Sequence, residues 1–183
     1  MATSAFYDAG SLAQVAINLF YGWGYNFYRL ENQLRADDQL IRSKVAWLLG
    51  SARKSVATAE SDYRREFLPP PSRAQPRPEP AAVAGAQTLE RLARAIGAVE
   101  GLIHAQPVPE NDRMTQRYRG EAETLHRLSI SDQQLAGQAE LLRTLADQKD
   151  GPWLIEHSAE LQEGLQAINE TLRQRQGLLF PVL

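Results

Sequence analysis

Proline dominates residues 69–80 and divides this chain into two helical parts. The segment holds six of the ten prolines in 183 residues. Proline lacks a backbone N–H and restricts φ, so such a stretch cannot continue a helix and favours extended polyproline II geometry. No two of these prolines are three residues apart, and the spacing of PxxP recognition peptides is therefore missing. We interpret the segment as a linker or long loop between residues 1–68 and residues 81–183, which we expect to pack as one domain.

Apolar residues on both sides of this segment recur with the spacing of α-helices. They lie three or four positions apart from Ile41 to Phe67, and the same spacing covers about 82–105. Weaker stripes follow, and Gly151-Pro152 predicts a helix end and a new start. In the last stripe Leu154, Leu161 and Ile168 are seven residues apart, as in a bundle seam. We predict an all-α antiparallel helical bundle of five to six helices.

The start of the chain allows two arrangements. Ser11 with Gln14 has the spacing of a capping box, and Ser131 with Gln134 repeats it, which predicts helix starts at both serines. From residue 11 to residue 67 the apolar stripe stays in phase. This region is therefore either one long helix, kinked near Gly22 and Gly24, or an αα-hairpin.

Composition and missing motifs exclude several function classes. The chain has no cysteine, which excludes disulfides, thiol nucleophiles and cysteine zinc sites. Its net charge of −2 includes no strongly basic part, so we expect no nucleic-acid partner. It has neither a secretory signal pattern nor an apolar run long enough for a transmembrane segment, and we expect a cytoplasmic protein. It also lacks nucleophile-elbow and phosphate-loop motifs, which favours a non-enzymatic function without a cofactor.

The aromatic residues are concentrated near the N-terminus. Eight of the fourteen lie in the first 28 positions. If this segment is a helix, its rings cannot all face one buried side, so some must contact other helices, a partner, a ligand or a membrane surface. Aromatic residues are enriched in protein interfaces. We define the aromatic segment as the candidate contact residues Tyr21, Trp23, Tyr25, Phe27 and Tyr28.

A second candidate contact is the apolar C-terminal tail, residues 178–183, which contains Phe180 and Leu183. Pro181 prevents a helix from continuing through it. The tail either folds back over the bundle or docks into a partner. The first functional hypothesis is thus a helical interaction protein (an adaptor, assembly factor or regulatory subunit) that binds a protein partner or itself.

Histidines carry the alternative hypothesis of a small-ligand or metal site within an aromatic-lined pocket. Each has a glutamate one helical turn away, and Glu123 with His126 matches the Glu-x-x-His element of di-iron bundles. No second such element is present, and a boundary histidine beside an exposed carboxylate is the commoner explanation. The other candidate ligands are His104 and His157.

Small residues also recur along one predicted helix. Ala93, Gly97 and Gly101 are four positions apart, so they share one face of that helix. Because glycine is unfavourable inside a helix, this spacing predicts the close approach of a neighbouring helix there.

Overall fold

The computed structural model describes residues 4–20, 34–73, 76–106 and 122–179, and these are helical with no strand. The elements are a 3-10 turn η1 (Ala5–Tyr7) and the helices α1 (Ala9–Phe20), α2 (Leu34–Phe67), α3 (Pro80–Ala105), α5 (Ala122–Ala146), α6 (Gly151–Glu156) and α7 (Ser158–Leu179). The predicted all-α fold is confirmed. None of the described helices is long and apolar enough to cross a bilayer.

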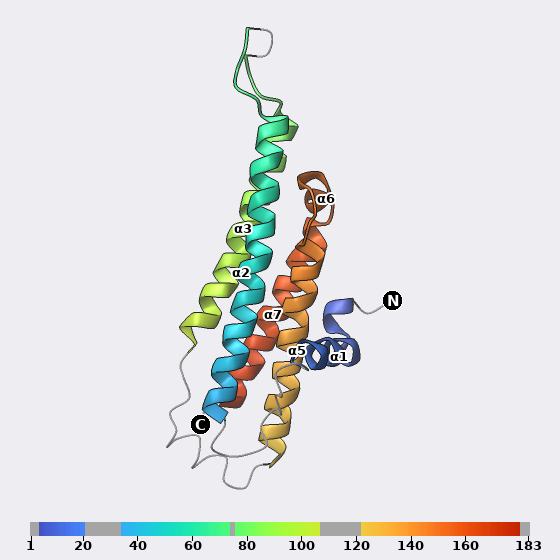
Figure 1. The fold of residues 1–183 in the computed structure, drawn as a ribbon, viewed down its shortest axis with the longest axis vertical. Coiled ribbons are helices and arrows are strands. Elements are labelled where there is room, and N and C mark those ends of the chain that lie inside the picture. Colours follow the sequence, from blue (N-terminus) through green and yellow to red (C-terminus); the bar gives the residue numbers. More distant parts are fainter. Residues whose placement is uncertain (1–3, 21–33, 74–75, 107–121, 180–183) are drawn as a thin grey trace.

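The four long helices lie side by side as a bundle. Figure 1 shows α2 and α5 running in one direction and α3 and α7 in the other. Helix α2 packs against both α3 and α5, and α7 packs against α5 and α3. The short α6 lies against α2 and α3, at the end of the bundle where α5 turns back toward α7. Apolar side chains from all four long helices form one continuous core.

The proline-rich segment connects α2 to α3 at the tip of these two helices, beyond the rest of the bundle (Figure 1). Its described residues are all exposed, and half-buried Leu68 lies between the segment and α2. The region 11–67 contains two helices, α1 and α2, with residues 21–33 outside the described range. Of these two helices, α2 is the longer one. Helix α1 packs mainly across α5, on the outside of the bundle (Figure 1).

Two glycines allow the N-terminal element to pack closely on the bundle. A Cβ at Gly137 of α5 would lie 2.5 Å from the backbone oxygen of Leu12 in α1. A Cβ at Gly164 of α7 would lie 2.6 Å from the ring of Phe6. Phe6 is 1% exposed, so its ring fills the space beside Gly164. Because glycine has no side chain at these two positions, η1 and α1 can approach α5 and α7 closely.

The capping predictions require correction. Helix α1 begins at Ala9, and its cap is Asp8, whose Oδ1 accepts from the backbone N–H of Gly10 and Ser11. The hydroxyl of Ser11 donates to Asp8 Oδ2 at 2.7 Å. These bonds to the ionised carboxylate lower the pKa of Asp8. Helix α5 does not begin at Ser131 but passes through it, because the apolar contacts of the core already start one turn earlier, at buried Leu128.

The glycine strip of α3 is not a site of close helix contact. A Cβ at Gly97 would meet the aliphatic part of Arg53 at 3.2 Å, and a Cβ at Gly101 would meet nothing within 4 Å. The space above Gly97 is instead occupied by a long side chain from α2. Arg53 reaches across it to form an ion pair with Glu100, with Nε 3.2 Å from Oε2.

Candidate functional site

The predicted contact residues lie outside the described part of the chain. These are the five residues of the aromatic segment together with Phe180 and Leu183 of the tail. The elements that they adjoin in the sequence are described: Leu34, the first residue of α2, follows Tyr28 after five residues, and Phe180 follows the last residue of α7. Helix α2 begins and α7 ends at the same end of the bundle (Figure 1).

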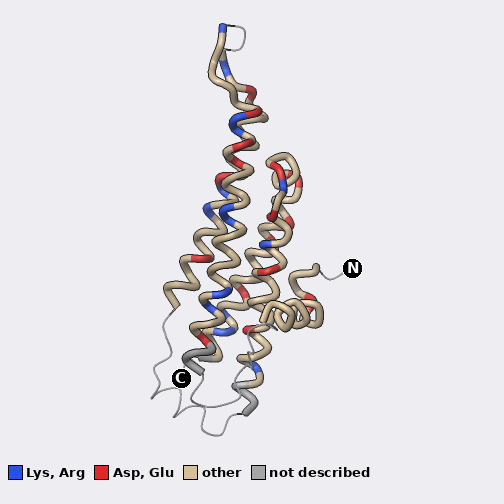
Figure 2. Tube along the Cα trace, in the orientation of Figure 1, with Lys and Arg blue, Asp and Glu red and all other residues tan. Residues whose placement is uncertain are grey.

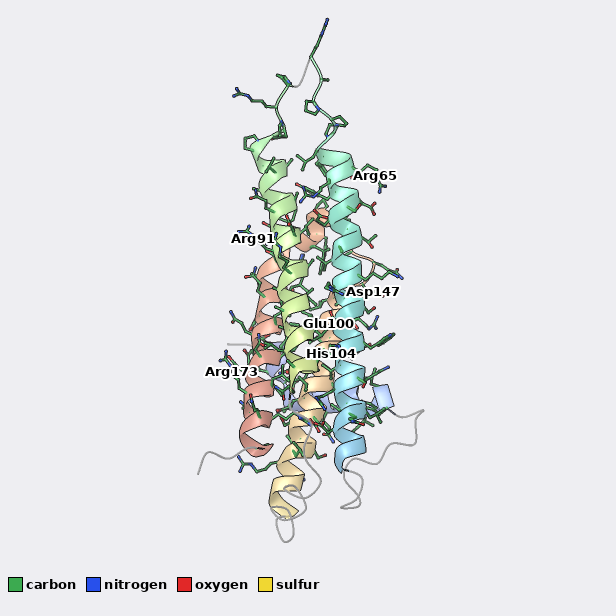
Figure 3. The ribbon with its side chains drawn as sticks, turned by 90° about the vertical axis from the view of Figure 1, so that its left-hand side faces the viewer. Arg65, Arg91, Glu100, His104, Asp147 and Arg173 are labelled. Atoms are coloured by element: carbon green, nitrogen blue, oxygen red, sulfur yellow. The ribbon has the colours of Figure 1, made fainter. Side chains whose placement is uncertain are left out.

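The candidate metal ligands are distributed over both ends of the molecule. His104 is exposed in the last turn of α3, one turn beyond Glu100 (Figure 3). His126 is exposed on α5, and the side chain of Glu123 lies outside the described residues. Among the described side chains, no group of three or more metal-ligating residues is close enough to hold an ion. A metal site at Glu123 and His126 stays a prediction.

His157 is held by its own helical turn. It joins α6 to α7, at the opposite end of the bundle from His104 (Figure 1). Its ring stacks on Trp153 with centroids 3.8 Å apart, and Nδ1 lies 2.9 Å from the Trp153 carbonyl oxygen. Because a carbonyl only accepts, Nδ1 is the donor in this hydrogen bond. This histidine stabilises the turn between two helices.

Four charged side chains inside the bundle form a cluster that we call the ionic clamp. Asp38 and Arg42 come from α2, Asp132 from α5 and Arg175 from α7. Arg175 is 1% exposed, and its Nη2 donates to Asp38 Oδ1 while its Nε donates to Asp132 Oδ1, each at 2.5 Å. One guanidinium therefore joins two carboxylates from two other helices.

Arg42 extends the ionic clamp to a fourth helix. Its Nη2 lies 2.7 Å from Asp38 Oδ2, and its Nη1 donates to the backbone oxygen of Gln106 at 2.9 Å. Gln106 is the residue that caps the C-terminus of α3. A planar guanidinium with donors along two edges suits this bridging geometry better than a lysine ammonium would. The ionic clamp thus links all four long helices near one end of the bundle.

The charges of the ionic clamp indicate that its role is structural. Two carboxylates and two guanidinium groups sum to zero charge, and each buried ion faces an opposite one, as burial of charge requires. Arginine does not lose its proton in proteins, so neither cation can act as an acid or base. The chemistry available to the ionic clamp is to fix the relative positions of the helices.

The sequence does contain a signal for this cluster. Arg175 is seven residues after Ile168, so it continues the seam that begins at Leu154. Asp132 lies between Leu128 and Leu135, both buried, in the apolar stripe of α5. A charged residue in the apolar seam of one helix is therefore a candidate buried ion when the seam of another helix contains a residue of opposite charge.

Large apolar side chains are exposed near the end that holds the ionic clamp. Leu102 is 54% exposed one residue before buried Ile103, in the last turns of α3. Ile130 is 41% exposed two residues before Asp132. Trp47 on α2 is 60% exposed, with Lys44 Nζ 4.5 Å from its ring centroid. Charges of both signs are interspersed along the helices (Figure 2).

Comparisons with protein families, curated proteins and solved structures found no match to this chain.

Proposed function

We propose that this chain is a non-enzymatic helical-bundle interaction protein, acting as an adaptor, assembly factor or regulatory subunit. It binds a protein partner through the aromatic segment and the apolar C-terminal tail. The observation that supports this most directly is the contact of Asp38 with Arg175, which holds the start of α2 against the end of α7. The start of α2 and the end of α7, which adjoin the two predicted contact segments in the sequence, therefore lie at the same end of the bundle.

The ionic clamp restrains the described helices that adjoin the two segments, which favours binding at this end. Association costs translational freedom and the ordering of side chains, and a surface held in place before binding avoids part of that cost. The ionic clamp restrains the four helices at this end. Tyrosine, tryptophan and phenylalanine then supply large contact area with few rotatable bonds, which is why such residues dominate binding energy in many interfaces.

The test compares binding with stability in the full chain. Trp23→Ala and removal of residues 178–183 are each expected to weaken the captured partner complex or self-association by about tenfold or more, as for hot-spot residues. Thermal unfolding should change little. Binding is measured by affinity capture with quantitative mass spectrometry and by sedimentation velocity, and stability by circular dichroism.

Phe67→Ala is the control, because it removes an exposed aromatic side chain from the last residue of α2, at the opposite end of the bundle. We expect it to retain partner binding. Equal losses of binding and of thermal stability in the Trp23 variant would mean that this ring belongs to the core, and would contradict the proposal.

A further inference from the structure

The outer face of α2 and α3 carries an open groove that only these two of the described helices line. Its volume is about 810 Å³. Helices α2 and α3 lie on the side of the bundle that faces the viewer in Figure 3, with α5 and α7 on the far side. The groove contains no residue of the ionic clamp, and none of the contact or metal-ligand residues predicted from the sequence. What covers it is therefore a question separate from the proposed function.

Two alanines lie side by side in the middle of the groove. The side chain of Arg53 in α2 lies over Gly97 in α3. Because the two helices are antiparallel, Ala57, four residues after Arg53, lies beside Ala93, four residues before Gly97. Ala57 is exposed and Ala93 is half-buried. Since the distance between packed helices depends on the side chains at the contact, another helical surface can approach closely at these methyl groups.

Charges of opposite sign lie on the two sides of these alanines. In α2, Lys54 is three residues before Ala57, and Glu60 is three residues after it. In α3, Glu90 is three residues before Ala93, on the same side of the alanines as Glu60, since one arginine contacts both carboxylates. The groove is therefore positive at Lys54 and carries two carboxylates at the other side.

Ion pairs within the chain leave Lys54 available. The other charged residues at the groove are paired between or within α2 and α3: Arg53 with Glu100, Arg64 with Glu60 and with Glu90, and Arg94 with Glu90. No ion pair joins Lys54 to another of the described side chains, and it is exposed. Arg64 contacts Oε1 of Glu60, which leaves Oε2 of this carboxylate to accept from another donor.

This arrangement is complementary to itself. A two-fold axis that crosses the groove at the level of the alanines sets α2 antiparallel to α2 of a second copy, and α3 antiparallel to its counterpart. Lys54 of each copy then faces Glu60 of the other, since both lie three residues from Ala57. From this charge complementarity we propose that a second copy of this chain packs on the groove, with Ala57 and Ala93 at the centre of the interface.

The α2/α3 face is large enough for such an interface. Helix α3 has 26 residues, so it is about 39 Å long, and two helices side by side are roughly 20 Å wide. The resulting area of about 800 Å² is what one partner contributes to a standard interface. Ala93 is near the middle of α3 (Pro80–Ala105), so the antiparallel copies overlap along this whole helix. Because the ion pairs are exposed and the central side chains are small, the association is weak.

The experiment is sedimentation velocity of the full-length protein at increasing concentration, up to about 1 mM, where a dissociation constant on the order of 0.1 mM gives mostly dimer. Ala57→Glu places two like charges together at the axis and should weaken the dimer by about tenfold or more. Thr58→Glu is the matched control, because it introduces the same residue at the next exposed position, outside the groove. It should leave the association unchanged. Circular dichroism checks that both variants keep the helical fold.

Exchanging the charges of Lys54 and Glu60 tests the symmetry. Lys54→Glu or Glu60→Lys alone sets like charges opposite each other in the dimer and should weaken association by about tenfold. The double variant should recover the affinity of the unmodified protein. An equal mixture of the two single variants should also associate, because each chain then supplies the charge that the other lacks.

Three results would overturn the proposal. A monomer at every concentration would mean that no second copy covers the groove. A dimer that is unaffected by Ala57→Glu would show that the copies meet through another surface, such as the aromatic segment. A mixture of Lys54→Glu and Glu60→Lys chains that associates no better than either variant alone would exclude the two-fold arrangement.

Discussion

Arg175 is the residue whose replacement we expect to destabilise this fold most, because two buried carboxylates share its guanidinium. Arg175→Met keeps much of the side-chain volume but leaves Asp38 and Asp132 without this cation in a low-dielectric interior. Removing one partner of a buried ion pair typically costs about 3–5 kcal/mol in the free energy of unfolding. We expect a loss of this size in urea denaturation followed by circular dichroism.

Arg173→Met is the control for this substitution. Arg173 lies two residues earlier on α7, is exposed and points away from the bundle (Figure 3). Its replacement should change the free energy of unfolding by less than about 0.5 kcal/mol. In a second comparison, the quadruple variant Asp38→Leu, Arg42→Met, Asp132→Leu and Arg175→Met should be more stable than Arg175→Met alone, since it removes every charge of the ionic clamp together and leaves none of them buried without its partner. A small effect of Arg175→Met would mean that its contacts carry little net energy.

The sequence alone predicts that Arg175 lies on the same helix face as Ile168. It does not predict that the side chain of Arg175 is buried. Seven-residue spacing places it on the same seam as Ile168, and the buried apolar residues of that seam were predicted correctly. A charged residue at the end of a seam can be a buried ion. It is equally typical of the point where a helix extends beyond the core. The partners that decide the question are 43 and 137 residues away in the chain. Pairing over such separations depends on topology.

The docking of α1 depends on a single glycine in a neighbouring helix. Gly137→Ala would place a methyl group 2.5 Å from the Leu12 carbonyl oxygen and 2.9 Å from its Cα, and these backbone atoms cannot turn away as a side chain can. Such overpacking costs about 1–3 kcal/mol. We expect α1 to separate from α5 in part, so that native-state hydrogen exchange shows lower protection in α1 than in α2 and α3.

Gly101→Ala is the matched control for this helix contact. Gly101 is exposed inside α3 with nothing within 4 Å of its Cβ position. The same chemical change should therefore stabilise the protein, by about 0.5–1 kcal/mol, through helix propensity alone. Unchanged protection of α1 in the Gly137 variant would show that the element adjusts its position without loosening.

Helix boundaries were predictable where the local chemistry is strong. The break at Gly151-Pro152 is confirmed, and Asp150 caps the new helix by accepting from the backbone N–H of Trp153 at 2.9 Å. The predicted start at Ser131 was wrong because a serine followed three residues later by glutamine also occurs inside helices. The glycines that permit close contact could not be told from the others, since Gly137 matters only because α1 crosses α5 at that position.

At the scale of the whole molecule, the two sides of the proline-rich segment share one core. Six of the described side chains of α2 are fully buried, and they pack on helices from the far side of the segment: Ile41, Val45, Leu48, Leu49, Ala52 and Val56. Burying each of the larger ones contributes about 1.5–3 kcal/mol relative to exposure. Residues 81–183 without α2 would therefore leave a large apolar surface in water, and we expect that fragment not to fold.

Cleavage of the proline-rich segment tests this directly. A protease site placed at residues 70–73, which are exposed, can be cut in the folded protein without breaking a helix. We expect the two pieces to stay together, to retain the helical circular dichroism of the intact chain, and to give the combined mass of about 20.4 kDa in native mass spectrometry. Each piece purified alone should be largely unfolded, and mixing the two should restore the helical signal. Cooperative unfolding of the isolated piece 81–183 would instead show that it is an independent domain, with α2 packed on it as a separable addition.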